Sequence, residues 1–399
     1  MGIISEKISK IAPSLTLEIT AKAKKMKAEG ISVIGFGAGE PDFNTPDYII
    51  EGAKKALDTG FTKYTPASGM PELKKAICEK FYKDNGLKYE PAQIVISSGA
   101  KSSLYHAICA LVDEGDEVIL PSPYWLTYPE LIKLAGGKCV FLPAGKENGY
   151  KVTAEQIISA VTPKTKCIIL NSPNNPTGAV YSEKELRDIA KVAEDKKLFV
   201  ISDEIYEKLI YCGEKHFSIA AVNDYMKGHT VVVNGVSKSY AMTGWRIGYL
   251  AAPLEIAKAI SSMQSHTTSN ACSISQYASV VALTDERGEE FIEKMQKIFD
   301  ERRKYMVQAL NEIDGIVCIE PKGAFYVFVD VSAFYGKKYE GTVIDGSLSF
   351  AECALKAGVA LIPGAAFGDD NCIRLSYAIS MEDIKEGINR IAKYIREIK

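Results

Sequence analysis

The 399-residue sequence has few histidines, no paired cysteine motif and no long apolar run. Its four histidines are not spaced with one another or with cysteine as metal ligands, so we expect no metal site. The nine cysteines include no Cys-x-x-Cys pair, and an odd number of scattered thiols is typical of reduced cysteines in a cytoplasm. A disulfide-stabilised secreted protein is therefore not expected.

Charge and hydropathy exclude further classes of protein. The net charge of -2 gives no reason to expect nucleic acid or an anionic membrane as a partner. No stretch approaches the ~18 uncharged apolar residues of a membrane span, and the first residues lack the apolar core of a signal peptide. We therefore expect a cytoplasmic globular protein, in keeping with 47% hydrophobic and 25% charged residues.

The length predicts two domains, because single hydrophobic cores stop growing at roughly 250–300 residues. We place a large α/β domain at 46–285, and a smaller domain formed by 1–45 together with 286–399. Short apolar runs alternate with helical periodicity through the large domain, which is typical of βα units around a mostly parallel sheet. The expected buried strands are 93–97, 117–120, 166–170, 198–202 and 230–233, and an aromatic-rich strand is expected at 323–330.

Polar segments follow four of these strands. They are SGAK (98–101), NSPNNPTG (171–178), DEIY (203–206) and NGVSKS (234–239). Ligands of a doubly wound sheet bind beyond the carboxyl ends of its strands. The four segments therefore predict one polar site assembled along a single edge of the sheet.

The same segments resemble a known family. NSPNNPTG, SDEIYE (202–207) and SKSYAMTGWRIGY (237–249) resemble signature segments of the fold-type I aminotransferases, which depend on pyridoxal 5′-phosphate. YTPASGMPELKKAI (64–77) and IRLSYA (373–378) resemble theirs too, and the order is kept over essentially the whole chain. The branch that the chain resembles most is subgroup Ib of the aspartate aminotransferases.

The resemblance implies a mostly parallel seven-stranded sheet in the large domain, a smaller α/β domain, and a homodimer with shared active sites. It also implies residues around the cofactor ring. Lys238 would bind the cofactor aldehyde through its amine and then carry protons, and Asp203 would pair with the pyridine nitrogen. Tyr206 and Asn175 would hydrogen-bond the phenolic oxygen, and Asn175 would also face the substrate. Without the resemblance, Lys238 could be a surface lysine, Asp203 a helix cap and Asn175 a turn residue.

For the phosphate group, the resemblance implies donors from three segments. Gly99, Ala100 and Lys101 open a helix, so their backbone N–H groups and the helix dipole face an anion. Ser237 would add a hydroxyl and Arg246 a guanidinium. All five residues are expected to bind the cofactor.

The remaining implied residues concern the ring face, the partner subunit and the substrate. Tyr64 would reach the phosphate of the other subunit, and Trp125 would stack on the pyridine ring beside the substrate. Arg374 would bind the α-carboxylate bidentately, next to the backbone of Gly39. Lys101 would bind the distal carboxylate of aspartate or glutamate, with an exposed first-turn lysine as the alternative.

The expected reaction moves the amino group of L-aspartate to 2-oxoglutarate, so amino acids and 2-oxo acids are the expected partners. Transamination of prephenate or aromatic amino acids is an open alternative, and a pyridoxal-phosphate lyase is a less favoured one. A regulatory protein of this fold would carry a DNA-binding module, for which the N-terminal extension is too short. Lys24, Lys25 and Lys27 form a charge cluster that we expect on the solvated face of one helix.

Overall fold

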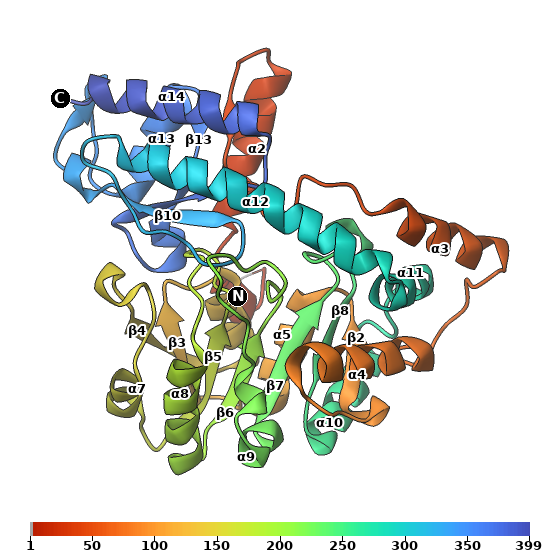
Figure 1. Ribbon diagram of the computed structural model, residues 1–399. Coiled ribbons are helices and arrows are strands. Elements are labelled where there is room, and N and C mark those ends of the chain that lie inside the picture. Colours follow the sequence, from red (N-terminus) through yellow and green to blue (C-terminus); the bar gives the residue numbers. More distant parts are fainter. Residues whose placement is uncertain (1–2) are drawn as a thin grey trace.

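The computed structural model describes residues 3–399 (Figure 1). Met1 and Gly2 lie outside the described residues. They belong to the N-terminal segment in which we expect no signal peptide. The central sheet has seven strands in the order β2-β8-β7-β6-β5-β3-β4, which confirms the predicted α/β class. The strands are β2 (Ile94–Ser97), β3 (Glu117–Ser122), β4 (Lys138–Pro143), β5 (Thr165–Asn171), β6 (Phe199–Asp203), β7 (Thr230–Gly235) and β8 (Gly248–Ala251).

Within this sheet, β8 is the strand that runs against its neighbours. It pairs antiparallel with both β2 and β7, whereas β3, β4, β5, β6 and β7 pair in parallel. Strand β2 therefore points the same way as β7, and its carboxyl end lies at the same edge of the sheet. The predicted strands of this central sheet are found within one or two residues of their expected bounds, whereas β4 and β8 were not predicted.

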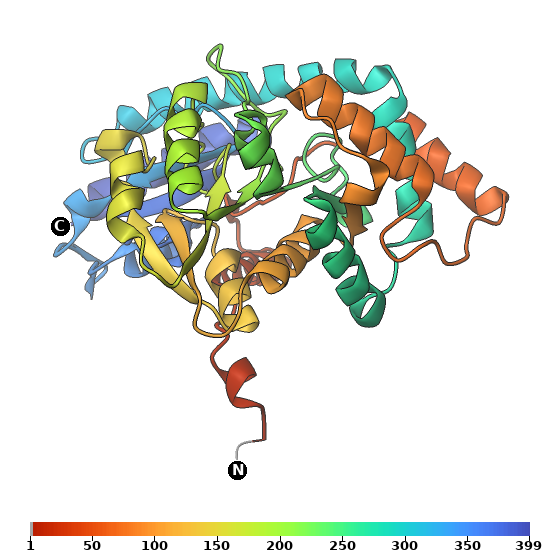
Figure 2. The same ribbon diagram turned by 90° about the horizontal axis from the view of Figure 1, so that it is seen from below.

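Alternating residues of the strands pack into layers on the two sides of the sheet. In β5, Cys167 and Ile169 pack among the residues of α5, α6 and α10, whereas Ile168 and Leu170 face α7 and α8. Figure 2 shows the sheet between these layers. The helices around the sheet are α3 (Asp47–Asp58), α4 (Pro71–Asn85), α5 (Ala100–Leu111), α6 (Thr127–Ala135), α7 (Ala154–Ala160), α8 (Glu183–Asp195), α9 (Asp224–Gly228), α10 (Leu254–Thr267) and α11 (Ser273–Thr284).

A second, antiparallel sheet lies above the first in Figure 1, with the order β14-β15-β10-β9. The expected strand at 323–330 is β10 in this sheet. The elements of the region are α12 (Arg287–Asn311), β9 (Val317–Cys318), β10 (Tyr326–Asp330), β11 (Lys338–Tyr339), β12 (Thr342–Val343), α13 (Ser347–Lys356), β13 (Val359–Ala360), β14 (Ile362–Pro363), β15 (Cys372–Ser376) and α14 (Met381–Glu397).

The N-terminal segment joins this second region. After α1 (Glu6–Ser9) and α2 (Leu15–Ala28), strand β1 (Ile34–Gly35) pairs in parallel with β13, which attaches the N-terminal segment to the C-terminal region. The domain bounds at 46–285, and at 1–45 with 286–399, stay a prediction. Among residues 3–399, no helix combines the length and apolar character that crossing a membrane requires.

Candidate active site

A cavity of about 630 Å³ opens where the carboxyl ends of the central strands meet the second sheet. It is lined by residues that follow β2, β3, β5, β6 and β7, together with the 35–40 loop and β15. Eleven of the thirteen predicted site residues line it: Gly39, Ala100, Lys101, Trp125, Asn175, Asp203, Tyr206, Ser237, Lys238, Arg246 and Arg374. The predicted convergence of polar segments at one edge of the sheet is therefore observed.

Lys238 follows β7 and points into the cavity, where its Nζ donates a hydrogen bond to the carbonyl oxygen of Gly39 at 2.5 Å. Burial disfavours the charged ammonium and lowers the pKa of Lys238 to about 8. Glu40 acts in the opposite direction, whereas the positive charge of Arg246 lowers the pKa further. This amine is therefore much easier to deprotonate near neutral pH than an ordinary lysine.

Asp203 is the last residue of β6 and is only 3% exposed. Its Oδ2 accepts a hydrogen bond from the Tyr128 hydroxyl at 2.7 Å, and its Oδ1 accepts one from the backbone N–H of Ile205 at 3.2 Å. Burial raises the pKa of Asp203 to about 6, and the two hydrogen bonds partly offset this rise. The site thus holds a desolvated carboxylate that a cationic partner would stabilise.

Arg374 enters the cavity from β15 and is 2% exposed. Its Nη1 donates to Oδ1 of Asn175 at 2.9 Å and its Nη2 to the carbonyl oxygen of Gly37 at 3.3 Å. Its Nε is buried and has no hydrogen-bond partner among the described residues. Because a buried donor without a partner is costly, this guanidinium is ready to bind an anion.

Tyr206 lies beside this arginine, 4% exposed. Its hydroxyl is 3.0 Å from the hydroxyl of Tyr326, and the ring of Tyr326 lies 4.4 Å from the guanidinium carbon of Arg374. The cavity wall therefore combines two phenols with a stacked guanidinium.

Three groups converge where α5 begins at Ala100. Gly99 has a φ of 83°, in the left-handed region that favours glycine. A Cβ on Gly99 would lie 2.2 Å from Nη2 of Arg246, so a side chain there would displace the guanidinium. The buried Ser237 also lines this part of the cavity. A helix N-terminus, a guanidinium and a hydroxyl together fit an anion such as a phosphate.

Lys101 and Trp125 lie together on another wall. The Nζ of Lys101 is 5.0 Å from the ring centroid of Trp125, and the Trp125 ring packs edge-on against Tyr128 at 5.4 Å. The pKa of Lys101 is lowered, first because the cavity wall partly removes it from water and then because Arg246 adds a like charge. Lys101 is therefore a further cation in the cavity that Arg374 enters.

Two predicted residues do not line the cavity. Gly99 lies directly before the lining residue Ala100. Tyr64 lies between α3 and α4 and is 88% exposed, so within its own chain it does not contribute to the site. The prediction that Tyr64 serves the partner subunit stays a prediction.

Sequence reasoning missed Tyr128, Tyr326 and Glu40, all of which line the cavity. Tyr326 lay inside the predicted strand at 323–330, where alternation places it on the face opposite Val327. Tyr128 and Glu40 carried no such signal, because their importance depends on contacts with distant segments.

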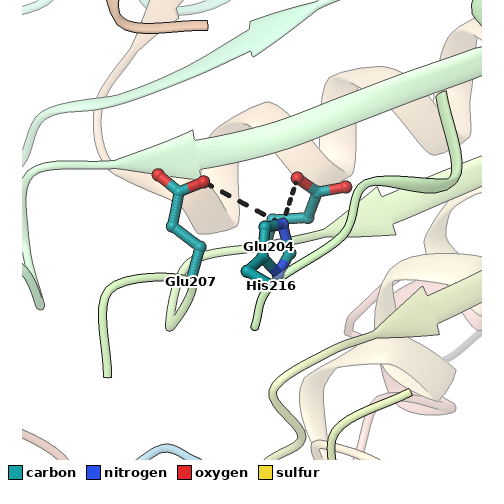
Figure 3. A group of neighbouring side chains, drawn as sticks. All are labelled: Glu204, Glu207 and His216. Carbon is teal, nitrogen blue, oxygen red and sulfur yellow. Dashed lines mark hydrogen bonds and ion pairs between the residues drawn. The ribbon is translucent and has the colours of Figure 1, made fainter. Parts of the chain in front are cut away.

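A buried acidic group also escaped prediction (Figure 3). Side-chain atoms of Glu204, Glu207 and His216 lie within 4.8 Å of one another, as in a metal site. Glu204, however, already accepts hydrogen bonds from Ser202 at 2.8 Å and Ser218 at 2.6 Å, and lies 2.9 Å from Nε2 of His216.

Glu207 is likewise satisfied, because it pairs with Lys80 and accepts a hydrogen bond from Asn85 at 3.0 Å. We therefore interpret the group as a buried ion network behind the site. The expectation of no metal site stays a prediction.

The donor set fits pyridoxal 5′-phosphate. The cavity offers an amine with a lowered pKa at Lys238, a buried carboxylate at Asp203 and an anion cradle at the start of α5. These groups match the aldehyde, the basic ring nitrogen and the phosphate of that cofactor. The buried, unpartnered Nε of Arg374 remains for a further anion.

Comparison with known proteins agrees with this fit. The family model described as "Aminotransferase class I and II" matches residues 31–391. The aspartate aminotransferase of Bacillus sp. (strain YM-2) is 48% identical over 395 residues, covering 99% of both chains. The probable aspartate/prephenate aminotransferase of Aquifex aeolicus is 48% identical over 396 residues, also covering 99% of both.

Solved structures agree as well. The aspartate aminotransferase of Rhizobium meliloti superposes with a TM-score of 0.96 at 42% identity, covering 100% of both chains. The Thermus thermophilus aspartate aminotransferase with maleate gives a TM-score of 0.94 at 39% identity, covering 99% of this chain and 100% of that one. The chain therefore belongs to the class I and II aminotransferases and, like the class I enzymes, uses pyridoxal 5′-phosphate.

Proposed function

We propose that the protein is an aspartate aminotransferase, which moves the amino group of L-aspartate to 2-oxoglutarate and gives oxaloacetate and L-glutamate. The observation that carries the proposal is the presence of two cations, Arg374 and Lys101, in the cavity that also contains Lys238. A dicarboxylate has one anionic group for each of them. The names of the relatives support the same substrate.

When bound, pyridoxal 5′-phosphate supplies an aldehyde for the substrate amine and a ring that accepts electrons from the substrate Cα. Lys238 would hold that aldehyde. Asp203 would keep the ring nitrogen protonated, because the negative carboxylate would stabilise the positive charge on that nitrogen. Tyr206 and Asn175 would donate hydrogen bonds to the phenolic oxygen, and Trp125 would lie against the ring.

The phosphate would be held by residues that converge at the start of α5. Backbone N–H groups of Gly99, Ala100 and Lys101 would bind it together with the Ser237 hydroxyl and the Arg246 guanidinium. The clash that a Cβ on Gly99 would make with Arg246 supports this arrangement, because it shows how closely the guanidinium approaches the loop.

Lys238 would also move the proton of the reaction. When its nitrogen is not bound to the cofactor, the Lys238 amine would take the proton from the substrate Cα. The lowered pKa of Lys238 supports this role, because a neutral amine is a base and an ammonium is not.

Arg374 would bind the α-carboxylate of the substrate next to the backbone of Gly39, with its unpartnered Nε as one of the donors. Lys101 would bind the distal carboxylate, and Asn175, held by Arg374, would border the substrate together with Trp125. Aspartate/prephenate aminotransferases among the relatives support prephenate as a second substrate.

The active form would be a homodimer with shared active sites. In this dimer Tyr64 would reach the phosphate in the partner subunit, and its 88% exposure leaves it available for such a contact. The proposed location is the cytoplasm, in keeping with nine free cysteines.

The test is an absorbance titration of the cofactor-loaded protein with L-aspartate, L-alanine and L-phenylalanine, without a 2-oxo acid. Loss of the yellow band at a low concentration of aspartate supports the proposed function. Bleaching by another amino acid and not by aspartate would leave an aminotransferase of different specificity, and no bleaching by any of them would favour a lyase.

A further inference from the structure

One face of α2 forms a wall of the active-site cavity. Thr16, Thr20, Ala23, Lys24 and Lys27 all line it, and their spacing places them on one side of a helix. At a rise of about 1.5 Å per residue, this wall runs for about 16 Å. This side of the cavity is therefore about three helical turns long.

Thr20 marks where this wall passes Arg374. A Cβ on Gly37 would lie 3.2 Å from the Oγ1 of Thr20, and the carbonyl oxygen of Gly37 accepts a hydrogen bond from Arg374. Lys24 and Lys27 follow Thr20 by about 6 Å and about 10 Å along the helix axis. They thus form the outer end of the wall, beyond the proposed binding site of the substrate α-carboxylate.

The cavity is strongly cationic, although the whole chain has a net charge of -2. Six basic side chains line it and only two acidic ones, Glu40 and Asp203. Four of the six have proposed roles at the cofactor or the substrate. The other two, Lys24 and Lys27, have no role at the cofactor or the substrate in the proposed function.

The lysines of α2 divide into two pairs. Lys22, Lys24, Lys25 and Lys27 are all exposed, as we expected for the charge cluster, but only Lys24 and Lys27 line the cavity. Among the described residues, Lys25 forms an ion pair with Glu29, with 3.9 Å between Nζ and Oε1. Lys24 and Lys27 form no ion pair with any described residue. The expected solvated face is therefore observed, and two of its three clustered lysines also border the cavity.

We propose that Lys24 and Lys27 form a cationic rim that attracts dicarboxylates into the cavity, above all 2-oxo dicarboxylic acids, before Arg374 and Lys101 bind them. This proposal rests on the proposed function. Charged walls of a cleft raise the local concentration of an oppositely charged substrate, and salt weakens this effect. The attraction should follow the substrate charge, since 2-oxoglutarate carries two negative charges, aspartate a net charge of one, and alanine none.

The test compares Lys24→Ala/Lys27→Ala with the matched control Lys22→Ala/Lys25→Ala, in the holoenzyme. Both variants lose the same charge from the same helix, and alanine preserves the helix. The measured quantity is the second-order rate constant of each half-reaction with 2-oxoglutarate, aspartate and alanine, as a function of ionic strength.

For the rim variant at about 10 mM salt, we expect a fall of about sevenfold with 2-oxoglutarate and about threefold with aspartate. No change is expected with alanine, and the differences should disappear at about 0.5 M salt. Calorimetric binding of succinate, a dicarboxylate that does not react, should weaken with the same salt dependence. The control variant should behave as the wild type.

Three results would overturn the proposal: no loss at low salt, an equal loss with alanine, or an equal loss in the control variant. The first would show that the lysines attract nothing, the second a change of structure, and the third an effect of net charge alone. A failure of the proposed function is distinguishable, because it would appear in the wild type as the absence of a half-reaction with either dicarboxylate.

Discussion

The hydroxyl of Tyr128 donates a 2.7 Å hydrogen bond to Oδ2 of Asp203, and both side chains are buried. Tyr128 belongs to α6 and Asp203 ends β6, so the contact connects a helix beside the sheet with the proposed partner of the cofactor ring. By stabilising the carboxylate, this hydrogen bond counteracts the rise in the pKa of Asp203 that burial causes.

Replacing Tyr128 with Phe should raise the pKa of Asp203 above its value of about 6. A hydrogen bond to a charged group contributes about 1.5–3 kcal/mol, or roughly one to two pKa units. At pH 7 less of the carboxylate would be ionised, so the apoenzyme should bind pyridoxal 5′-phosphate about tenfold more weakly.

The affinity of this variant should approach that of the wild type near pH 9, where the carboxyl is ionised in both. Equilibrium binding of the cofactor to the apoenzyme at several pH values measures this. Tyr124→Phe is the control, since Tyr124 stacks on Phe141 and does not line the cavity. A loss of affinity that is the same at every pH would show that Tyr128 only fills space.

The lowered pKa of Lys238 predicts how the apoenzyme captures its cofactor. The neutral amine attacks the aldehyde, and with a pKa of about 8 it dominates above pH 8, whereas an unperturbed lysine requires a pH above about 10.4. The rate of covalent capture should therefore rise with pH through a midpoint near 8.

Because the carboxylate of Glu40 raises this pKa, Glu40→Gln should move the midpoint to lower pH. Stopped-flow absorbance of apoenzyme mixed with cofactor gives both profiles, and Lys238→Ala should show no covalent capture. A wild-type midpoint near 10 would contradict the environment described for Lys238.

Much of the site could be predicted because the carboxyl ends of parallel strands must meet at one edge. Asp203 and Lys238 each follow a strand whose apolar residues are readable in the sequence, so their proximity follows from the sheet order. The roles assigned to them came from the resemblance to a family and not from the pattern itself.

Other features depend on contacts that no local pattern encodes. Strand β4 is an edge strand with exposed positions, so no buried apolar run marks it in the sequence. The cluster Lys24, Lys25 and Lys27 was identifiable, but which of its members face the cavity depends on how α2 packs. Tyr128 and the network around Glu204 depend on tertiary contacts between separate elements.

The buried network predicts a pH-dependent contribution to stability. Burial by itself raises the pKa of Glu207, but Lys80, His216 and Lys208 lower it to about 2. For a carboxyl whose pKa is depressed by folding, the stabilisation is present above the unfolded value of about 4.3 and is lost as the pH falls toward 2.

Glu207→Gln should therefore lower the free energy of unfolding at pH 7 by up to about 3 kcal/mol, because it removes the nearest carboxylate from the buried Lys80 and leaves it with Asn85 at 2.8 Å and Asp84 at 3.7 Å. The difference from the wild type should narrow below about pH 4. Urea unfolding at pH 7 and at lower pH measures this difference in the free energy of unfolding.

Glu51→Gln, which breaks the exposed pair with Lys54, is the control and should have no measurable effect on the free energy of unfolding. An equal destabilisation by both variants would contradict a special role of the network.

Replacing Lys101 with Ser separates the distal carboxylate from the α-carboxylate. Aspartate has both groups and alanine only the second. Lys101→Ser should therefore lower kcat/KM for aspartate by about tenfold to a hundredfold, and kcat/KM for alanine should stay within about threefold of the wild-type value.

Arg374→Lys is the matched contrast. It keeps a charge but loses the bidentate geometry, so it should lower kcat/KM for both amino acids alike. Steady-state rates of the two variants with both amino acids give the comparison. If Lys101→Ser lowered both by the same factor, Lys101 would act on the cofactor and not on the substrate side chain, because only a contact with the distal carboxylate distinguishes aspartate from alanine.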